Sequence, residues 1–476
     1  MLSIGSRREC FFDEYLIDTG LTTAEFRLHE PVRRERVLVH DAPWEGDGCD
    51  FHNILKDDDL YRMYYLGWWM LDKGKGKDIY VCYAESTDGL NWIKPNLGLF
   101  EYEGSTDNNI ILTKEFHGSH IDNFMVFKDT NPACPADALY KAVAFYKNPD
   151  TRHPELHSYI SSDGIRFTKK GLVTDKGQFD TLNVAFWDEC AGKYRCYFRS
   201  FHDVPENGDL NAGIRDIRYI ESADFVNWTE PVILDFGDAE DIPLYTNVVQ
   251  PYPRAPHMLV GFPSRYAEYP EWTENFDELA GREKRLERMK HHPRYGLTVT
   301  DCVFMCSRDG WHFKRYDEAF MTPGPEVPTN WVYGDCYPSY GLIETPSAIP
   351  GADKELSFFT FDNHWMGIPT DLYRYSMRMD GFVSLHAGAK EQTIVTKPFT
   401  FEGMELFANL ATSARGYVIF ILTDENGKKY ESCRTFGNST DKRIHFGENV
   451  LASLAGKEVT LTMRIKDADI YSIQFR

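Results

Sequence analysis

Short apolar runs separated by polar turns follow one another along most of the chain. Runs of this length, rich in Val, Tyr and Phe, are typical of β-strands. One turn motif recurs behind them: Ser, any residue, Asp, Gly, two further residues and an aromatic residue, with Asp and Gly favouring a tight turn. Its copies span 86–92, 161–167, 222–228 (with Phe in place of Gly), 307–313 and, in degenerate form, 378–382.

Two further strand-like runs precede each copy of the motif, for example 51–55 and 61–65 before the first copy. Together with the strand before the turn and the strand after it, each unit then has four strands. Five such units without regular intervening helices predict an all-β fold, a five-bladed β-propeller over residues 1–387. A β-sandwich is the alternative, and the fivefold recurrence of one turn motif argues against it.

Two segments depart from this pattern. Residues 268–293 are rich in Glu, Lys and Arg with apolar residues at a rough helical spacing, which predicts a helical insertion between the second and third strands of unit four. Residues 388–476 contain short alternating strands around polar turns such as 424–427. We expect this segment to form a small β-sandwich appended to the propeller.

Composition and charge narrow the classes of function. The chain has 476 residues, 14% of them aromatic, and 52 Lys and Arg against 73 Asp and Glu give a net charge of −21. This charge would repel nucleic acid and anionic membranes, and no run of apolar residues is long enough to span a bilayer. The expected partner is therefore a neutral small molecule, with homo-oligomerisation left open, and the aromatic rings suit stacking on flat ligands such as sugars.

The cysteines and the N-terminal segment bear on location and on cofactors. The ten cysteines show no CxxC pair and no zinc-type spacing, so the sequence indicates no metal site and no cofactor. The first ten residues contain no apolar signal-peptide core. These features predict reduced thiols and a cytoplasmic protein.

Carboxylates precede the first strand of several units. In a propeller the innermost strands start on one face, so residues at those starts converge on a central funnel. This places Asp50, Asp122 and Asp180 together as catalytic candidates, because crowded carboxylates shift one another's pKa as acid/base chemistry requires. Each Asp could instead cap a turn, and each Asn could bond a neighbouring blade. The same starts supply further candidates for substrate binding: His120, Asn183, Tyr245, Asn247 and Asp335.

Loops joining the second and third strands return to the same face and should form the rim of the funnel. They are rich in rings that can stack on sugars and in groups that can bond hydroxyls, although ordinary loop residues are the alternative. The rim candidates are Trp68, Trp69, Arg199, Arg265, His364 and Trp365.

Several of these segments carry a resemblance to a known group. The sequences PWEGDG (43–48), FHN (51–53), YRMYY (61–65), NVAFW (183–187) and RAPH (254–257) are similar to those of five-bladed propeller glycoside hydrolases of families 32, 43 and 68. Family-32-like proteins with a C-terminal β-sandwich are the nearest in pattern. The resemblance covers nearly the whole chain.

The resemblance implies roles for the three carboxylates. Asp50 would be the nucleophile or base, Asp122 the transition-state stabiliser and Asp180 the general acid. The family 32 motifs N-D-P-N-G and R-D-P are absent, and the Glu189-Cys190 pair lies past the end of its strand, so it does not match the family's E-C motif. The third carboxylate is Asp where the family has Glu. Other carboxylates that could supply the acid are Glu45, Asp47, Asp203 and Asp335.

The predicted function is an exo-acting glycosidase on a small oligosaccharide or glycoside, which could be a furanoside. Two alternatives stay open. One is a non-catalytic carbohydrate-binding propeller. The other is a glycoside phosphorylase, for which Arg199, Arg265 and His364 are the basic candidates. The sequence leaves open the sugar, the linkage and whether the anomeric configuration is retained or inverted.

Overall fold

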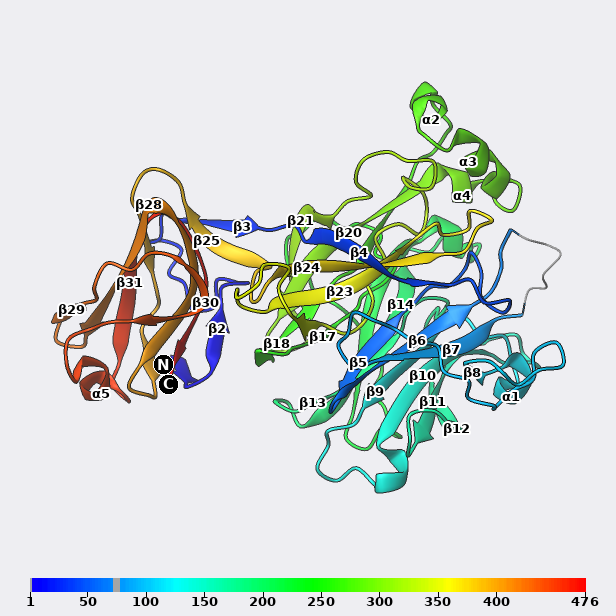
Figure 1. The fold of residues 1–476 in the computed structure, drawn as a ribbon, viewed down its shortest axis with the longest axis horizontal. Helices are drawn as coiled ribbons and strands as arrows, with labels where there is room; N and C mark the ends of the chain where they lie inside the picture. The colour runs from blue at the N-terminus through cyan, green and yellow to red at the C-terminus, as the bar shows by residue number, and fades with distance from the viewer. Residues whose placement is uncertain (1, 72–77) are drawn as a thin grey trace.

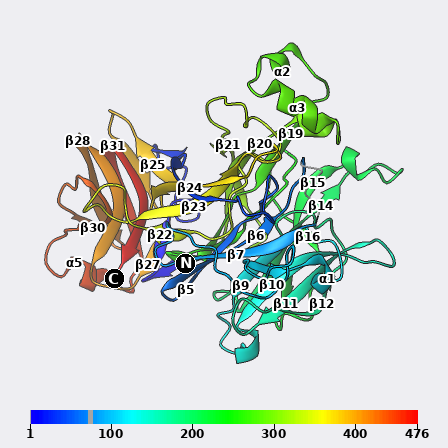
Figure 2. The same cartoon turned by 45° about the vertical axis from the view of Figure 1, so that its right-hand side comes forward.

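The computed structural model describes residues 2–71 and 78–476, and these residues form two β-rich modules (Figure 1). One module is a five-bladed β-propeller, as predicted, with one four- or five-stranded antiparallel sheet per blade. The other module contains both chain termini and lies beside blade five in Figures 1 and 2. Each module has its own cluster of buried apolar side chains. Among the described residues, no helix is long and apolar enough to cross a membrane.

Blades one to three each consist of four consecutive strands, with the first strand innermost. Short helical turns lie in the connections: α1 (Lys114–His117), η1 (Ala136–Ala138) and η2 (Leu210–Ala212). The strands are β5 (Asn53–Asp57), β6 (Leu60–Gly67), β7 (Tyr80–Ser86) and β8 (Ile110–Leu112) in blade one, β9 (Phe124–Lys128), β10 (Tyr140–Lys147), β11 (Pro154–Ser161) and β12 (Thr168–Thr174) in blade two, and β13 (Val184–Asp188), β14 (Lys193–His202), β15 (Ile214–Ser222) and β16 (Val232–Ile233) in blade three.

Blades four and five deviate from this regular order. In blade four, two strands share the second position, and the outer strand of blade five comes from the N-terminal part of the chain. The strands are β17 (Gln250–Tyr252), β18 (Ala255–Gly261), β19 (Ser264–Glu268), β20 (Thr298–Ser307) and β21 (Lys314–Met321) in blade four, and β22 (Ile343–Thr345), β23 (Glu355–Asp362), β24 (Asp371–Arg378) and β4 (Val32–Val39) in blade five.

The outer strand of blade five differs from the expectation. The repeat pattern placed the strand after the 378–382 turn in this position, but that strand is β25 (Val383–Ala387), which pairs in the second module. Strand β4 takes its place and pairs antiparallel with β24. The propeller is therefore closed by joining an early strand of the chain to the last blade.

The recurring turn motif joins neighbouring blades. In the second copy, Ser161 Oγ accepts the Gly164 N–H, and the Asp163 carboxylate accepts the N–H groups of the two residues after Gly164. Gly164 has a φ of +74° and lies against blade one, where the Tyr64 hydroxyl donates to its carbonyl at 2.8 Å. The copy in blade four repeats this contact, because the Tyr197 hydroxyl of blade three donates to the Gly310 carbonyl at 2.8 Å. These turns therefore lock one blade against the next.

The degenerate fifth copy serves a different contact. Asp380 is fully buried and accepts hydrogen bonds from the Tyr252 hydroxyl of blade four and from Ser472 and Arg8 of the second module. Its carboxylate thus joins the propeller to the second module instead of capping its own turn.

The second module is all-β, as expected, but its strands are joined in one hydrogen-bonded sheet. The two longest strands pair with each other over most of their length, and one helix, α5 (Val450–Leu454), precedes the last strand. The strands are β1 (Leu2–Gly5), β2 (Arg8–Cys10), β3 (Glu25–Leu28), β25, β26 (Gln392–Val395), β27 (Phe399–Phe401), β28 (Leu406–Asp424), β29 (Lys429–Glu431), β30 (Asn438–Ile444) and β31 (Val459–Phe475).

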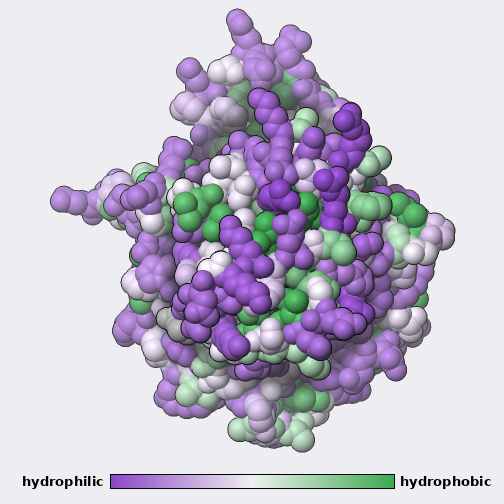
Figure 3. Space-filling model, turned by 90° about the vertical axis from the view of Figure 1, so that its left-hand side faces the viewer, coloured by the Kyte–Doolittle hydropathy of each residue, from purple (hydrophilic) through white to green (hydrophobic). Residues whose placement is uncertain are grey.

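The strand pairing divides the chain differently from the predicted boundary at residue 387. Strands β1, β2, β3 and β25, expected within the propeller, pair with strands of the C-terminal segment. Their apolar side chains complete the core of that module, which an isolated 388–476 segment would leave open. The outward face of the module is mostly hydrophilic, with apolar side chains in separate patches (Figure 3).

The predicted insertion is helical and lies between β19 and β20 of blade four. It consists of α2 (Glu274–Glu278), α3 (Arg282–Met289) and α4 (Arg294–Leu297), and stands out from the propeller in Figure 1. Arg285 and Arg288 of α3 are buried. Arg288 donates to the carbonyls of Tyr333 and His364 at 2.6 and 3.1 Å. The insertion thereby holds two segments that line the central cavity.

Candidate active site

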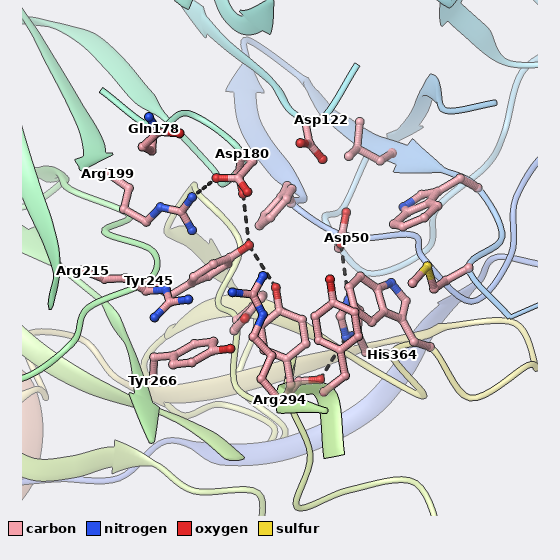
Figure 4. Close-up of a pocket in the computed structure, with 18 of the residues that line it drawn as sticks. Asp50, Asp122, Gln178, Asp180, Arg199, Arg215, Tyr245, Tyr266, Arg294 and His364 are labelled. Carbon is pink, nitrogen blue, oxygen red and sulfur yellow. Dashed lines mark hydrogen bonds and ion pairs between the residues drawn. The ribbon is translucent and has the colours of Figure 1, made fainter. Parts of the chain in front are cut away.

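A cavity of roughly 400 Å³ lies where the innermost strands of the blades begin (Figure 4). It is lined by side chains of all five blades and of α4. The three carboxylates that the sequence analysis placed in a funnel, Asp50, Asp122 and Asp180, all reach it. They precede β5, β9 and β13, so the shared start of the inner strands brings them together.

The acidic end of the cavity, defined by Asp50, Asp122 and His364, combines blades one, two and five. Asp50 is 4% exposed, and its Oδ1 has no hydrogen-bond partner among the described residues. Its Oδ2 lies 3.5 Å from Nε2 of His364. Asp122 retains a side-chain exposure of 28% and faces the open cavity.

Burial shifts the pKa values of Asp50, Asp122 and His364 to different extents. Burial first, and the neighbouring Asp122 charge second, raise the pKa of Asp50 well above its usual value. Burial raises the pKa of Asp122 only to about 6, since the Arg199 charge counteracts it. Burial, reinforced by Arg288, lowers the pKa of His364 to about 3. Near neutral pH this predicts a protonated Asp50, a neutral His364 and an ionised Asp122.

The orientation of His364 is fixed by a backbone carbonyl. Its Nδ1 lies 3.0 Å from the Tyr333 carbonyl, which can only accept, so Nδ1 carries the hydrogen and Nε2 presents a lone pair to Asp50. Gly334 makes this approach possible. It has a φ of +103°, and a Cβ there would lie 1.9 Å from His364 Nδ1. A glycine is therefore required beside the histidine.

The basic end of the cavity, defined by Arg199, Arg215 and Arg294, lies in blades three and four. Arg199 on β14 forms an ion pair with Asp180, whose side chain is 51% exposed. Arg215 on β15 is 5% exposed, with its guanidinium 3.9 Å from the Tyr266 ring centre. Burial lowers the pKa of Arg199, and the nearby Arg215 charge contributes in the same direction. Figure 4 shows these arginines across the cavity from Asp50.

Aromatic side chains connect the two ends. Tyr245 stacks on Tyr337 with ring centres 5.5 Å apart. The Tyr333 hydroxyl donates to the Tyr245 hydroxyl at 3.0 Å, and Tyr245 donates to the Asp180 backbone carbonyl at 3.0 Å. Polarised rings with fixed hydroxyls provide both apolar faces and hydrogen bonds for a ligand with many hydroxyl groups.

The PWEGDG segment (43–48) packs against the rings of Trp68 and Trp69. A Cβ on Gly48 would lie 2.4 Å from the Trp68 ring, and a Cβ on Gly46 would lie 2.5 Å from the Trp69 ring. Asp47 between them accepts the N–H groups of Met70 and Gly367 at 2.6 and 2.9 Å. The segment thus binds the loops of blades one and five together, and the Asp47 carboxylate is occupied by backbone donors.

Eight of the fourteen candidate residues line the cavity, and six do not. The eight are Asp50, Asp122, Asp180, Trp68, Arg199, Tyr245, His364 and Trp365. The remaining six are Trp69, His120, Asn183, Asn247, Arg265 and Asp335.

The two buried asparagines bond backbone carbonyls. Asn247 of blade four donates to the Leu182 carbonyl of blade three, so it joins two blades, which was the structural alternative for it. Asn183 donates to the Phe179 carbonyl of its own blade at 2.9 Å. Both side chains are almost completely buried, so their place at the start of the inner strands reflects backbone packing.

The other candidates outside the lining have different positions. Trp69 packs behind Trp68 against Gly46. His120 is a half-exposed side chain that lines a separate surface hollow, with its Nε2 4.0 Å from Asp122. Arg265 is paired with Asp301 at 2.5 Å, and Asp335 accepts the Val332 N–H at 2.8 Å.

Sequence reasoning missed most of the basic end and several tyrosines. Arg215 lies on the third strand of blade three, outside the inner-strand column and the rim loops. Arg294 directly follows the predicted insertion 268–293, so the position of that insertion on the rim of the funnel was its available signal. Tyr333 and Tyr337 flank the Asp335 position, and their spacing around that residue was a signal of the same kind.

Comparisons with known proteins find distant structural likenesses only. No family model and no curated protein matches the chain. Solved structures that match include an N-acetylgalactosamine deacetylase from F. plautii in complex with blood group B trisaccharide (13% identity, TM-score 0.42, 74% of this chain and 96% of that one). A GH32 beta-fructofuranosidase of Bombyx mori matches at 10% identity with a TM-score of 0.40, covering 94% of this chain and 93% of that one. A putative glycoside hydrolase from Parabacteroides distasonis matches at 11% identity with a TM-score of 0.40, covering 77% and 98%. Likenesses of this degree assign no activity to this chain.

Proposed function

We propose that the protein is a glycoside hydrolase that cleaves a glycosidic bond in the central cavity. The observation that carries this proposal is the pairing of Asp50 and Asp122 in an aromatic-walled cavity, where the first carboxyl group is almost completely buried and the second faces the open cavity. Burial raises the pKa of Asp50 well above its usual value and the pKa of Asp122 to about 6. Hydrolysis of a glycoside needs such a pair, because one carboxyl must donate a proton while the other stays ionised.

The electrostatics favour Asp50 as the general acid. A neutral Asp50 would give its proton to the glycosidic oxygen as the bond from that oxygen to the anomeric carbon breaks. The ionised Asp122 would either attack the anomeric carbon or activate the attacking water. These roles differ from those implied by the family resemblance, which made Asp180 the acid. Asp180 is held in an ion pair with Arg199, which suits it to binding a substrate hydroxyl.

The shape of the site supports exo-action on a small glycoside. The cavity is a pocket of roughly 400 Å³ at the mouth of the propeller, a volume at the lower end of the range for small-ligand sites. The furanoside preference and the cytoplasmic location remain predictions from the sequence. The ten cysteines all carry free thiols.

The test is a panel of aryl glycosides, pyranosides and furanosides, assayed with the full chain and with single variants. We expect D122N to lower turnover at least a hundredfold, and D50N to do so on the aryl glycosides with poor leaving groups. D150N, which changes an exposed carboxylate in the loop between β10 and β11, should leave turnover unchanged. Circular dichroism would check that all variants fold. Full activity of both D50N and D122N would contradict the proposal.

A further inference from the structure

The basic end of the cavity holds three arginines, and one of them, Arg215, has no described carboxylate as a counter-ion. Arg199, Arg215 and Arg294 come from β14, β15 and α4 and converge on one wall. Asp180 is the carboxylate of the cavity lining that pairs with this wall, and it pairs with Arg199. The carboxyl groups of Asp50 and Asp122 lie at the acidic end.

Arg215 is the clearest case of a charge without a counter-ion. Its side chain is almost completely buried, and among the described residues no carboxylate lies within ion-pair distance of it. Its Nε has no hydrogen-bond partner in the part of the chain that the structure describes. The guanidinium is covered by the rings of Tyr266 and Phe201, at 3.9 and 5.3 Å from their centres.

Burying the Arg215 charge without a counter-ion destabilises the folded protein unless a bound ligand supplies the opposite charge. An arginine keeps its charge at any accessible pH, so burial cannot be relieved by loss of a proton. Stacking on aromatic rings compensates only part of the lost hydration. The Nε of Arg199 is likewise buried without a partner among the described residues, so two adjacent guanidinium groups present unused donors.

We propose that the basic end is a subsite for an oxyanion, which Arg215 binds together with Arg199 and Arg294. This inference rests on the proposed function and specifies the substrate class. Two ligands could supply this oxyanion. One is the carboxylate of a hexuronic acid unit in the glycoside, and the other is free inorganic phosphate that replaces water in the reaction. Planar guanidinium groups suit both, because they donate two parallel hydrogen bonds to carboxylate or phosphate oxygens.

The two sources lead to different products. With a uronide, the carboxylate anchors the sugar, and water forms the new bond to the anomeric carbon. With phosphate, a phosphate oxygen forms that bond as the glycosidic bond breaks, and Asp50 transfers its proton to the departing oxygen. The product is then a glycosyl phosphate, and the leaving sugar carries the proton.

The test measures binding by calorimetry with the full chain, using glucuronate and galacturonate, the neutral matches glucose and galactose, and inorganic phosphate. We expect glucuronate, galacturonate or phosphate to bind at least tenfold more tightly than the neutral sugars. R215Q should weaken that binding about tenfold to a hundredfold. R218Q removes a charge from the same strand but outside the cavity lining, where Arg218 pairs with Asp216 at 3.0 Å, and should leave affinity unchanged.

Two further variants keep the test decisive. If R215Q does not fold by circular dichroism, R294Q tests the same wall from a different element, and R215K should retain part of the affinity by keeping the charge. Equal binding of neutral sugars and oxyanions, no binding of any of the oxyanions, or unchanged affinity in folded R215Q would overturn the inference.

Failure of the oxyanion subsite can be distinguished from failure of the proposed glycoside hydrolase activity. Hydrolysis of neutral glycosides without oxyanion binding would uphold the glycosidase and overturn the subsite. Oxyanion binding without turnover of any glycoside would uphold the subsite and contradict the glycosidase. Phosphate-dependent turnover with release of a glycosyl phosphate would identify phosphate as the source, and phosphate-independent turnover of uronides would identify the sugar carboxylate.

Discussion

The acidic and basic ends of the cavity are buried to a similar extent but respond to burial in opposite ways. Asp50 at the acidic end and Arg215 at the basic end are 4% and 5% exposed, and neither is ion-paired with a group of opposite formal charge among the described residues. Burial raises the pKa of a carboxyl group, so Asp50 keeps its proton and is a neutral hydrogen-bond donor. An arginine cannot release its proton, so Arg215 stays charged, and this buried charge is the basis of the proposed oxyanion subsite. The comparison thus underlies both proposals, proton transfer at one end of the cavity and anion recognition at the other.

Loss of the buried acid should have the largest effect at the acidic end. D50N removes the proton donor, and we expect kcat to fall about 10²- to 10⁴-fold on glycosides with poor leaving groups. Activated aryl glycosides need less protonation of the leaving oxygen and should lose less. Steady-state kinetics on a leaving-group series would measure this. An equal loss across the series would show that Asp50 is not the acid.

The pH dependence of kcat/KM should reveal both carboxyl groups. Activity should rise as pH increases through about 6, where Asp122 becomes ionised, and should fall at a much higher pH, where Asp50 loses its proton. D122N, with whatever activity remains, should lack the rising limb near pH 6. A profile that is flat between pH 5 and 8 in the unmodified protein would contradict this assignment.

A methyl group at Gly334 should damage the acidic end through His364. G334A places a Cβ at the position that His364 Nδ1 occupies, and its φ of +103° is strained for alanine. We expect a lower kcat and a loss of about 1–3 kcal/mol in unfolding free energy. G351A is the matched control, because Gly351 in blade five also has a positive φ of +80° but nothing within 4 Å of its Cβ position. Equal losses of kcat in both variants would contradict a specific role for His364.

The smallest expected effect is a change in the Tm of D50N. Whether Tm rises or falls at pH 7 shows whether Asp50 is protonated in the folded protein. Because the pKa of Asp50 is raised in the folded state, the unfolded chain releases this proton at lower pH, and folding stability is lost as pH rises above the unfolded value. D50N should therefore raise Tm at pH 7, and the difference from the unmodified protein should vanish below pH 4. Thermal melts at several pH values would measure it. A lower Tm of D50N at pH 7 would mean that the carboxylate is ionised and stabilising.

Local chemistry explains why the blades could be predicted. The hydrogen bonds of Ser161 and Asp163 and the positive φ of Gly164 are properties of a few adjacent residues, so they leave a repeating trace in the sequence. The convergence of Asp50, Asp122 and Asp180 follows from the same repeat, since it fixes where each inner strand begins.

Contacts between segments that are far apart in the chain leave no repeating pattern in the sequence. Strand β4 replaces β25 in blade five because of pairing across more than 300 residues, and no local pattern specifies that exchange. Arg215 reaches the cavity because β15 extends to its wall, and Arg294 because α4 packs there. Asn247 was ambiguous for the opposite reason. A buried amide at a strand start suits a substrate or a neighbouring blade equally well, and the structure shows that Asn247 bonds the neighbouring blade.

The central claim is that Asp50 is protonated and Asp122 ionised in the same cavity at neutral pH. The direct measurement is a pH titration of the side-chain carboxyl carbons by NMR, with ¹³C-labelled aspartate and with D50N and D122N to assign the two signals. The account predicts that the Asp122 signal titrates near pH 6 while the Asp50 signal stays that of a carboxylic acid through pH 7. An Asp50 signal that is already that of a carboxylate at pH 6 would contradict it.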